Sequence, residues 1–210
     1  MKLPIKVLKS DSILALETPP YTVDEMKFLA THIENVKQEQ DRLYLVLQIF
    51  HPMRLEEVLG LRWEDIDLTE GVIHIIRAAT HPTRNQPEVK ELKTEQSGRV
   101  IGLSEIAKKY LSSATNRQGF IIGGKKPLSY TQVRSMCSRI QKNTNFDGKI
   151  TPKRFRTTVL TDLYDVTKDI KLAQHAAGHT SPAMTLKHYV KVRESVSCSG
   201  QVINNLYSAS

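Results

Sequence analysis

The sequence predicts an α+β fold that is mainly α: a helical domain with a small three-stranded antiparallel sheet. Two observations lead to this prediction. Helix-start signals and apolar residues at helical spacing occur on both sides of one short region, residues 72–103. Inside that region, short runs rich in Val, Ile and Leu are separated by segments with Pro, Asn and Gly, as is typical of strands and turns. A chain of 210 residues fits one domain, or at most two small ones.

The helices expected before the sheet each have a recognisable beginning or end. Thr22-Val23-Asp24-Glu25 is a capping box, which opens a helix that we expect to continue to about Lys37. The second helix, residues 39–50, has apolar residues at helical spacing on one face. A third is expected to begin at Arg54 and to stop at Gly60, a residue type that often follows the end of a helix.

Three short strands are expected in the middle of the chain, with turn-forming residues between them. Pro82, Asn85 and Pro87 indicate a loop after the first strand. Residues 96–98 indicate a tight turn before the last strand. The expected strands are Val72–Arg77, Val89–Lys93 and Arg99–Leu103.

Helices are expected again after the sheet. Thr151-Pro152 is a strong start signal, with Thr151 as the N-cap and Pro152 at the first helical position. A last helical segment carries Tyr189, and the tail from about Ser195 is polar and rich in small residues. The four helices expected before that segment span residues 104–111, 129–141, 152–164 and 169–177.

The chain is strongly basic. Its 30 Lys and Arg residues against 22 Asp and Glu residues give a net charge of +8 and a pI near 9.4, which favours a polyanionic partner, nucleic acid or an anionic membrane surface. No run approaches the ~20 apolar residues of a transmembrane helix, and the N-terminus lacks the apolar stretch of a signal peptide. Cys137 and Cys198 lack metal-ligand and CxxC spacing, so we expect free thiols in a reducing, cytoplasmic location.

Two pairs of charged residues lie three positions apart on expected helices. Arg54 and Glu57 share one helix face, and such a pair taken alone is most often a surface ion pair of small energetic value. Lys153 and Arg156 share a face at a helix N-terminus, where free N–H groups and the helix dipole attract anions. Two cations at the positive end of a helix dipole are unfavourable for stability. The presence of both is therefore better explained by an anionic ligand.

His175 and His179 are four residues apart, a spacing that brings two metal ligands together on one helix. A zinc peptidase of that type has Glu directly after the first His, and here Ala176 stands in that place. Gly178 is expected to end the helix before His179, so the rings of His175 and His179 would not share one helix face. We therefore expect no metal site, with His175 as a packing or surface residue.

Taken together, these motifs resemble the active site of the tyrosine recombinases, the phage-integrase family of site-specific DNA strand-exchange enzymes. The resemblance covers the chain from about Thr22 to Tyr189. In chain order it is carried by Arg54 with the following Gly60-Leu61-Arg62-Trp63-Glu64-Asp65, by Lys93 in Lys93-Thr94-Glu95-Gln96-Ser97-Gly98-Arg99, by Lys153-Arg154-Phe155-Arg156, by Gly178-His179, and by Tyr189.

The resemblance implies which residues bind the DNA phosphate. Arg54 and Arg156 would donate hydrogen bonds to its non-bridging oxygens, where charge builds up in the transition state. His179 would contact the same phosphate, and Glu57 would hold Arg54 in place. Arg154, next to Arg156, is expected to point elsewhere and to serve the structure or the DNA backbone.

The resemblance also implies the covalent chemistry. Tyr189 would attack phosphorus and form a 3′-phosphotyrosyl intermediate, which conserves bond energy and requires no cofactor. Lys153 would accept the phenol proton, and Lys93 would protonate the departing 5′-oxygen. His179 and Tyr189 are one residue further apart than is usual in the family, so strict register would put His188 in the nucleophile's place. We expect an adjustment in the turn at residues 181–183 to restore Tyr189.

By resemblance, residues 21–194 form the catalytic domain. Residues 1–20 are extended and look like the linker to a DNA-clamping domain, so we expect a fragment of a longer protein rather than a naturally short relative. The tail, residues 195–210, is a candidate for docking on a neighbouring protomer. Strand exchange implies double-stranded DNA as partner and a homotetramer on two DNA sites, with a monomer as the state in isolation. On DNA the protein would be associated with the nucleoid.

Three other functions stay open at this point. A type IB topoisomerase-like enzyme would use the same chemistry to relax DNA. A non-catalytic relative would bind DNA without cutting it, and the long spacing between His179 and Tyr189 favours this alternative. A metal-dependent nuclease is the weakest candidate, because the sequence has no clustered carboxylates on matching elements.

Overall fold

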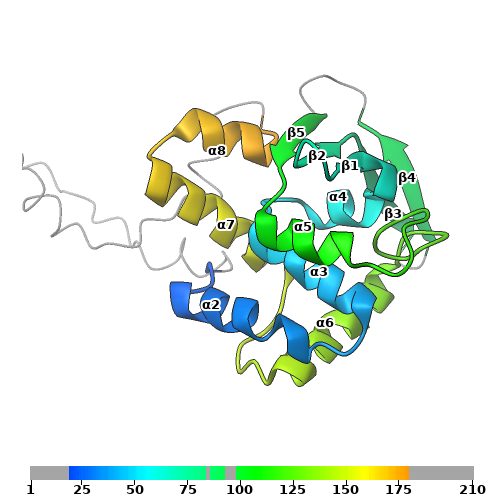
Figure 1. Ribbon diagram of the computed structural model, residues 1–210, viewed down its shortest axis with the longest axis horizontal. Helices are drawn as coiled ribbons and strands as arrows, with labels where there is room; N and C mark the ends of the chain where they lie inside the picture. The colour runs from blue at the N-terminus through cyan, green and yellow to red at the C-terminus, as the bar shows by residue number, and fades with distance from the viewer. Residues whose placement is uncertain (1–18, 84–85, 93–97, 180–210) are drawn as a thin grey trace, which may run out of the picture.

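The computed structural model describes residues 19–83, 86–92 and 98–179, and helices predominate in this part of the chain (Figure 1). The fold is the predicted one, mainly helical with small antiparallel sheets. The helical elements in chain order are α2 (Val23–Thr31), η1 (Ile33–Asn35), α3 (Glu39–Phe50), α4 (Leu55–Gly60), η2 (Trp63–Asp65), α5 (Glu105–Ser112), α6 (Tyr130–Thr144), α7 (Pro152–Thr167) and α8 (Ile170–Ala177).

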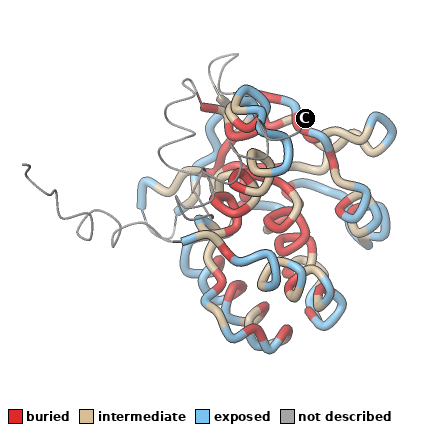
Figure 2. The backbone as a smooth tube through the Cα atoms, turned by 90° about the vertical axis from the view of Figure 1, so that its left-hand side faces the viewer, coloured by how far each residue is buried: buried red, intermediate tan, exposed pale blue. Residues whose placement is uncertain are grey.

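Helix α3 lies at the centre of the core. Every residue from Leu43 to Ile49 is buried, because α5, α6 and α7 all pack around it. The buried turns of the tube run through the middle of the molecule in Figure 2. The sequence indicated a helix with one apolar face, whereas α3 is enclosed nearly all round, as its dense apolar composition requires.

The strands pair differently from the sequence prediction. A three-stranded antiparallel sheet has the order β1 (Ile66–Asp67), β2 (Val72–Ile75) and β5 (Arg99–Gly102). A separate two-stranded ribbon joins β3 (Arg77–Thr83) and β4 (Gln86–Glu91). The expected first strand is therefore split at Ile76, and part of the expected loop is strand.

The prolines that indicated a loop are tolerated because the ribbon has only two strands. Pro82 lies between Thr80 and Thr83, where the register of the ribbon shifts. A proline has no N–H to donate, so it fits at such an irregular position of an edge strand. The predicted loop was therefore wrong over most of its length, because Pro82 lies in β3 and Pro87 in β4.

Close packing explains why the last residue of α4 is a glycine. A Cβ atom on Gly60 would lie 2.9 Å from the Cα atom of Ala78 in β3. Helix α4 therefore rests directly on the ribbon backbone, and this contact sets where the residues at the start of α4 lie.

The helix ends agree with local signals in most places. Thr22 and Glu25 form the predicted capping box, although α2 ends at Thr31, earlier than expected, and a short 3₁₀ turn follows. Pro152 begins α7 as predicted. The Thr151 side chain makes no capping hydrogen bond; instead its N–H donates to the Tyr21 hydroxyl over 3.0 Å. The contact with Tyr21 therefore satisfies the main-chain N–H of Thr151, and the expected side-chain cap is not formed.

None of the helices in the described part of the chain is long and apolar enough to cross a membrane.

Candidate active site

Arg54 and Glu57 meet at the first turn of α4. Arg54 precedes the helix, and its main-chain N–H donates to Glu57 Oε2 over 2.7 Å. Its Nη1 donates to Glu57 Oε1 over 2.8 Å. The Glu57 side chain is 3% exposed and that of Arg54 is 38% exposed. The pair is therefore a buried carboxylate that orients a partly open guanidinium, with the contact that the resemblance implied.

Arg99 is a site residue that the sequence analysis did not select. It lies on β5 and makes two hydrogen bonds with Glu57, Nη1 to Oε1 over 2.8 Å and Nη2 to Oε2 over 2.9 Å. The side chains of both residues are almost fully buried. A signal for it existed, because Arg99, Ile101 and Leu103 alternate with exposed residues and so share the core face of their strand. A charged residue at such a position requires a buried partner.

Arg156 reaches the same place from the second turn of α7. Its Nη1 donates to the Pro52 carbonyl over 2.6 Å and lies 3.8 Å from Glu57 Oε2. Its Nη2 donates to the Ala177 carbonyl over 2.7 Å and lies 3.2 Å from His179 Nε2. The structure thus brings Arg156 and His179 together, as the resemblance implied.

The C-terminal end of α8 is held by all three arginines. Arg99 Nε donates to the Ala176 carbonyl over 2.9 Å, and Arg54 Nη2 donates to the Gly178 carbonyl over 3.4 Å. Arg156 donates to the carbonyl of Ala177, which lies between these two residues. The last carbonyls of a helix lack intrahelical partners and carry partial negative charge, so guanidinium groups suit them. The arginines therefore fix the point at which the chain leaves α8 and enters the site.

Gly178 is required at this point for two reasons. Its φ of 62° and ψ of 47° lie in the left-handed region, which glycine adopts at little cost. A Cβ atom there would come within 2.8 Å of Arg99 Nη1. The next residue, His179, consequently turns into the interior, where it is buried.

The metal alternative finds no support in the geometry. His175 is exposed on α8 whereas His179 is buried beside Arg156, so the two rings do not converge. Within residues 19–83, 86–92 and 98–179, no group of three or more His, Cys, Asp or Glu side chains could hold a metal ion.

Arg154 and Lys153 have different surroundings. Arg154 lies over the Tyr21 ring, 3.8 Å from its centroid, and donates to the Pro19 carbonyl. It therefore points away from the site, as predicted. Lys153 is exposed and lines a hollow of about 390 Å³, together with Arg54, Leu55, Glu56, Thr151, Pro152 and Arg156.

The electrostatics of the site favour an anion. Burial by itself raises the pKa of Glu57, but the hydrogen bonds and charge of Arg99, with the charge of Arg156 and the N–H of Arg54, outweigh burial and lower the pKa to about 2. Glu57 is therefore ionised at neutral pH. Arg54, Arg99 and Arg156 surround this one carboxylate. Lys153 and Glu56, which also line the hollow, offset each other, so a surplus of two positive charges remains.

The other two predicted catalytic residues, Lys93 and Tyr189, lie outside the described residues, as does His188. Their placement in the site stays a prediction.

A family comparison matches residues 21–195 to the model described as the phage integrase family. The chain belongs to the phage integrase family. The match spans the whole of the segment predicted to be the catalytic domain, residues 21–194, and includes every predicted site residue.

Curated relatives of this integrase-family chain include tyrosine recombinases named XerS. That of Streptococcus gordonii is 26% identical over 154 residues, which cover 72% of this chain and 42% of the relative. That of Streptococcus pyogenes serotype M1 is 27% identical over 161 residues, which cover 70% of this chain and 41% of the relative. The chain thus spans less than half the length of these relatives.

Solved structures share the fold. The integrase of transposon Tn1549, in complex with circular intermediate DNA, superposes with a TM-score of 0.68 at 21% identity and covers 90% of this chain and 67% of that one. A XerH site-specific recombinase bound to palindromic difH substrate superposes with a TM-score of 0.64 at 17% identity. The superposition covers 88% of this chain and 52% of that one. At this identity the likeness concerns the fold.

Proposed function

We propose that this integrase-family chain is the catalytic domain of a site-specific recombinase that cuts and rejoins double-stranded DNA. The observation that carries the proposal is the convergence of Arg54, Arg156 and His179 beside one basic hollow. Their donors are held in advance by Glu57 and by the end of α8, so they need little rearrangement when charge develops on a phosphate.

The proposed step is a transesterification. The Tyr189 hydroxyl oxygen attacks phosphorus, its proton passes to Lys153, and the bond from phosphorus to the 5′-oxygen breaks. Lys93 protonates the departing 5′-oxygen, so that a 3′-phosphotyrosyl ester and a free 5′-hydroxyl result. Attack by a 5′-hydroxyl from a second DNA reverses the step and rejoins the strands. Lys153 supports this assignment, because it is exposed on the wall of the hollow.

The domain organisation and assembly belong to the same proposal. Residues 21–194 would form the catalytic domain, after a linker at residues 1–20. Four copies would act on two DNA sites, with the tail at residues 195–210 docking on a neighbouring protomer, and the DNA-bound protein would be associated with the nucleoid. Recombinases that share this fold have been solved in complex with DNA, which supports a DNA partner.

The test is to trap the covalent intermediate on nicked duplexes, in which the short released strand diffuses away and prevents religation. We expect a denaturant-resistant protein–DNA adduct that also forms in EDTA, since arginines supply the charge that metal ions supply in other nucleases. Tyr189→Phe should abolish the adduct and keep DNA binding. Tyr164→Phe, which changes a tyrosine near the far end of α7, is the matched control and should behave as wild type.

Other outcomes would select other functions. DNA binding without any adduct would identify a non-catalytic relative. An adduct that persists in Tyr189→Phe would identify a different nucleophile, with His188 the first candidate. Relaxation of supercoiled plasmid without strand exchange would favour a topoisomerase-like activity.

A further inference from the structure

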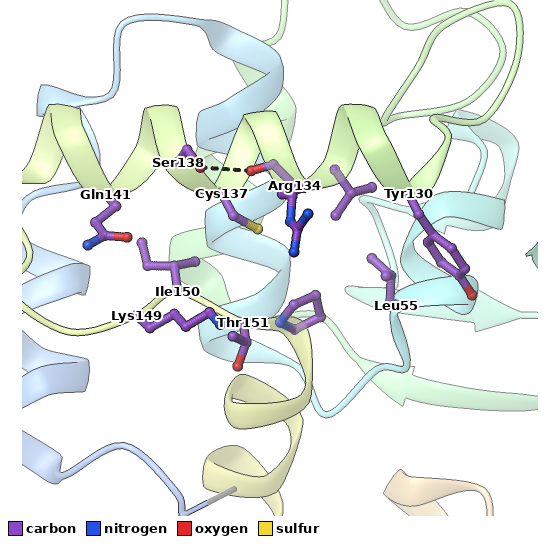
Figure 3. A pocket seen from close by; sticks show the side chains of 11 residues that line it. Leu55, Tyr130, Arg134, Cys137, Ser138, Gln141, Lys149, Ile150 and Thr151 are labelled. Atoms are coloured by element: carbon purple, nitrogen blue, oxygen red, sulfur yellow. Dashed lines mark hydrogen bonds between the residues drawn. The ribbon is translucent and has the colours of Figure 1, made fainter. Parts of the chain in front are cut away.

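The segment that leads into α7 borders a groove on one side. Figure 3 shows Lys149, Ile150 and Thr151 along one wall of this groove, with α6 on the other side. The groove has a volume of about 350 Å³, so the segment is not closely packed against α6 there. Lys153 follows in the first turn of α7. The position of this proposed proton acceptor therefore depends on what holds the segment in place.

The Tyr21 hydroxyl holds the segment on both sides of Ile150. It donates a hydrogen bond to the Lys149 carbonyl over 2.9 Å and accepts one from the Thr151 N–H over 3.0 Å. Tyr21 and Lys149 are 128 residues apart in the chain, so tertiary packing alone brings them together. A single hydroxyl thus clamps the main chain directly before α7 begins.

Tyr21 is fully buried and is itself fixed to α7. Its main-chain N–H donates to Thr158 Oγ1 over 2.7 Å. The centroid of its ring lies 4.9 Å from that of Phe155 and 3.8 Å from the guanidinium carbon of Arg154. These contacts hold the ring, and the ring carries the hydroxyl to the segment that it clamps.

The two cations of α7 that line the hollow beside Arg54 depend on this clamp to different degrees. The guanidinium of Arg156 is held by the carbonyls of Pro52 and Ala177. Lys153 is exposed, and within the described part of the chain its ammonium group makes no hydrogen bond or ion pair. The backbone of the first turn of α7 therefore sets where Lys153 lies.

Resting on the proposed function, we propose that Tyr21 is a positioning residue that acts through Lys153. Its hydroxyl fixes the start of α7, and this fixes the distance from Lys153 to the phenol whose proton it accepts. Proton transfer requires the acceptor to lie within hydrogen-bond reach of the donor. A displacement of about 1 Å caused far from the reacting atoms can therefore cost roughly 100-fold in rate. Because Tyr21 is buried, it acts through the backbone and not by contact with DNA.

The first test removes the hydroxyl and keeps the ring. Tyr21→Phe should slow adduct formation on nicked duplexes by roughly 10- to 100-fold at saturating DNA, while the dissociation constant for DNA stays unchanged. The matched control is Tyr44→Phe, because Tyr44 is also fully buried and its hydroxyl lies 3.9 Å from Cys137 Sγ on α6. This control should form the adduct at the wild-type rate.

A double-mutant cycle shows whether the effect passes through Lys153. If it does, Tyr21→Phe combined with Lys153→Ala should react no more slowly than Lys153→Ala alone, because no lysine is left to position. The losses from Tyr21→Phe and Arg54→Ala should instead multiply, since Arg54 lies before α4 and has its own contact with Glu57. Losses that multiply for Tyr21 and Lys153 as well would overturn the inference.

Hydrogen exchange tests the clamp without any reaction. Loss of its acceptor should make the Thr151 amide exchange faster in Tyr21→Phe but not in Tyr44→Phe, while the amides of the buried residues 43–49 stay protected and show that the fold is kept. Unchanged protection of Thr151, or a wild-type rate of adduct formation in Tyr21→Phe, would overturn the inference and leave the proposed function intact. If the wild-type protein forms no adduct on any duplex, the proposed function fails, and this inference with it.

Discussion

Arg99 and Glu57 form a buried ion pair with two hydrogen bonds of 2.8 and 2.9 Å, although they are 42 residues apart in the chain. The same carboxylate also binds Arg54 over 2.8 Å. Glu57 is thus the point at which α4, β5 and α7 are joined beneath the hollow. Because Arg99 also binds the Ala176 carbonyl, the end of α8 is tied to the same point.

Removing the Arg99 side chain should therefore lower the stability of the protein. Arg99→Ala leaves the buried Glu57 carboxylate without its main partner, and we expect a loss of about 3–5 kcal/mol in the free energy of unfolding, measured by denaturant titration. Arg99→Lys keeps a charge but not the paired geometry, so it should recover only part of the loss. Lys90→Ala, from an exposed ion pair with Glu88, is the control and should cost less than about 1 kcal/mol. An equally small effect for Arg99→Ala would contradict the arrangement.

Two glycines with left-handed backbone angles allow the cost of backbone strain to be measured separately from the cost of steric crowding. Gly71 and Gly178 have φ values of 67° and 62°, but a Cβ on Gly71 would meet no heavy atom within 4 Å, whereas one on Gly178 would meet Arg99 at 2.8 Å. Gly71→Ala should cost about 1–2 kcal/mol of stability from the left-handed backbone alone. Gly178→Ala should cost about 1–3 kcal/mol more and should also lower the rate of adduct formation, because it displaces Arg99 and His179. Equal losses of stability in the two variants would contradict this prediction, because they would show that the Arg99 side chain moves aside at no cost.

The pKa of Glu57 predicts how stability depends on acid. Its pKa falls from 4.5 to about 2 on folding, so its contribution is present above pH 4.5 and is lost as the pH falls toward 2. Burial lowers the pKa of His51 from 6.5 to about 4, which gives a further loss in the same direction between those two values. Glu57→Gln should be less stable than wild type at pH 7 and should show a flatter decline below pH 4.5. An unchanged slope in that variant would assign the acid sensitivity to other groups.

Lys93 can be tested by changing the leaving group. A thiolate leaves readily because its conjugate acid has a pKa near 8.5, so DNA with sulfur at the 5′-bridging position needs no proton donor. Lys93→Ala should cleave ordinary DNA more slowly by roughly 10²–10⁴-fold and should recover most of its rate on the sulfur substrate. Arg54→Ala and Arg156→Ala should not recover, since they act on the non-bridging oxygens. Equal slowness of Lys93→Ala on both substrates would assign the lysine to binding.

Local signals in the sequence predicted much of the helical framework. The capping box at Thr22 and Glu25, Pro152 at the start of α7 and Gly178 after α8 all mark helix ends in the structure. These features depend on hydrogen bonds and backbone angles within a few residues, which is why the sequence alone determines them. The motifs also predicted Arg54, Arg156 and His179 as residues of one site, and the structure brings them together at the end of α8, while their role in a reaction stays a prediction.

Strand pairing and the role of Arg99 were decided by the tertiary structure. β2 pairs with β5, while β3 and β4 pair with each other, and nothing in the local composition specifies which of several short strands become partners. Arg99 lies in a strand segment whose local pattern indicates burial, but its partner Glu57 is contributed by a helix distant in the chain. Local propensities determine where helices begin and end. Which buried charges meet depends on how those helices pack, because a buried charge is stable only where packing brings an opposite charge to it.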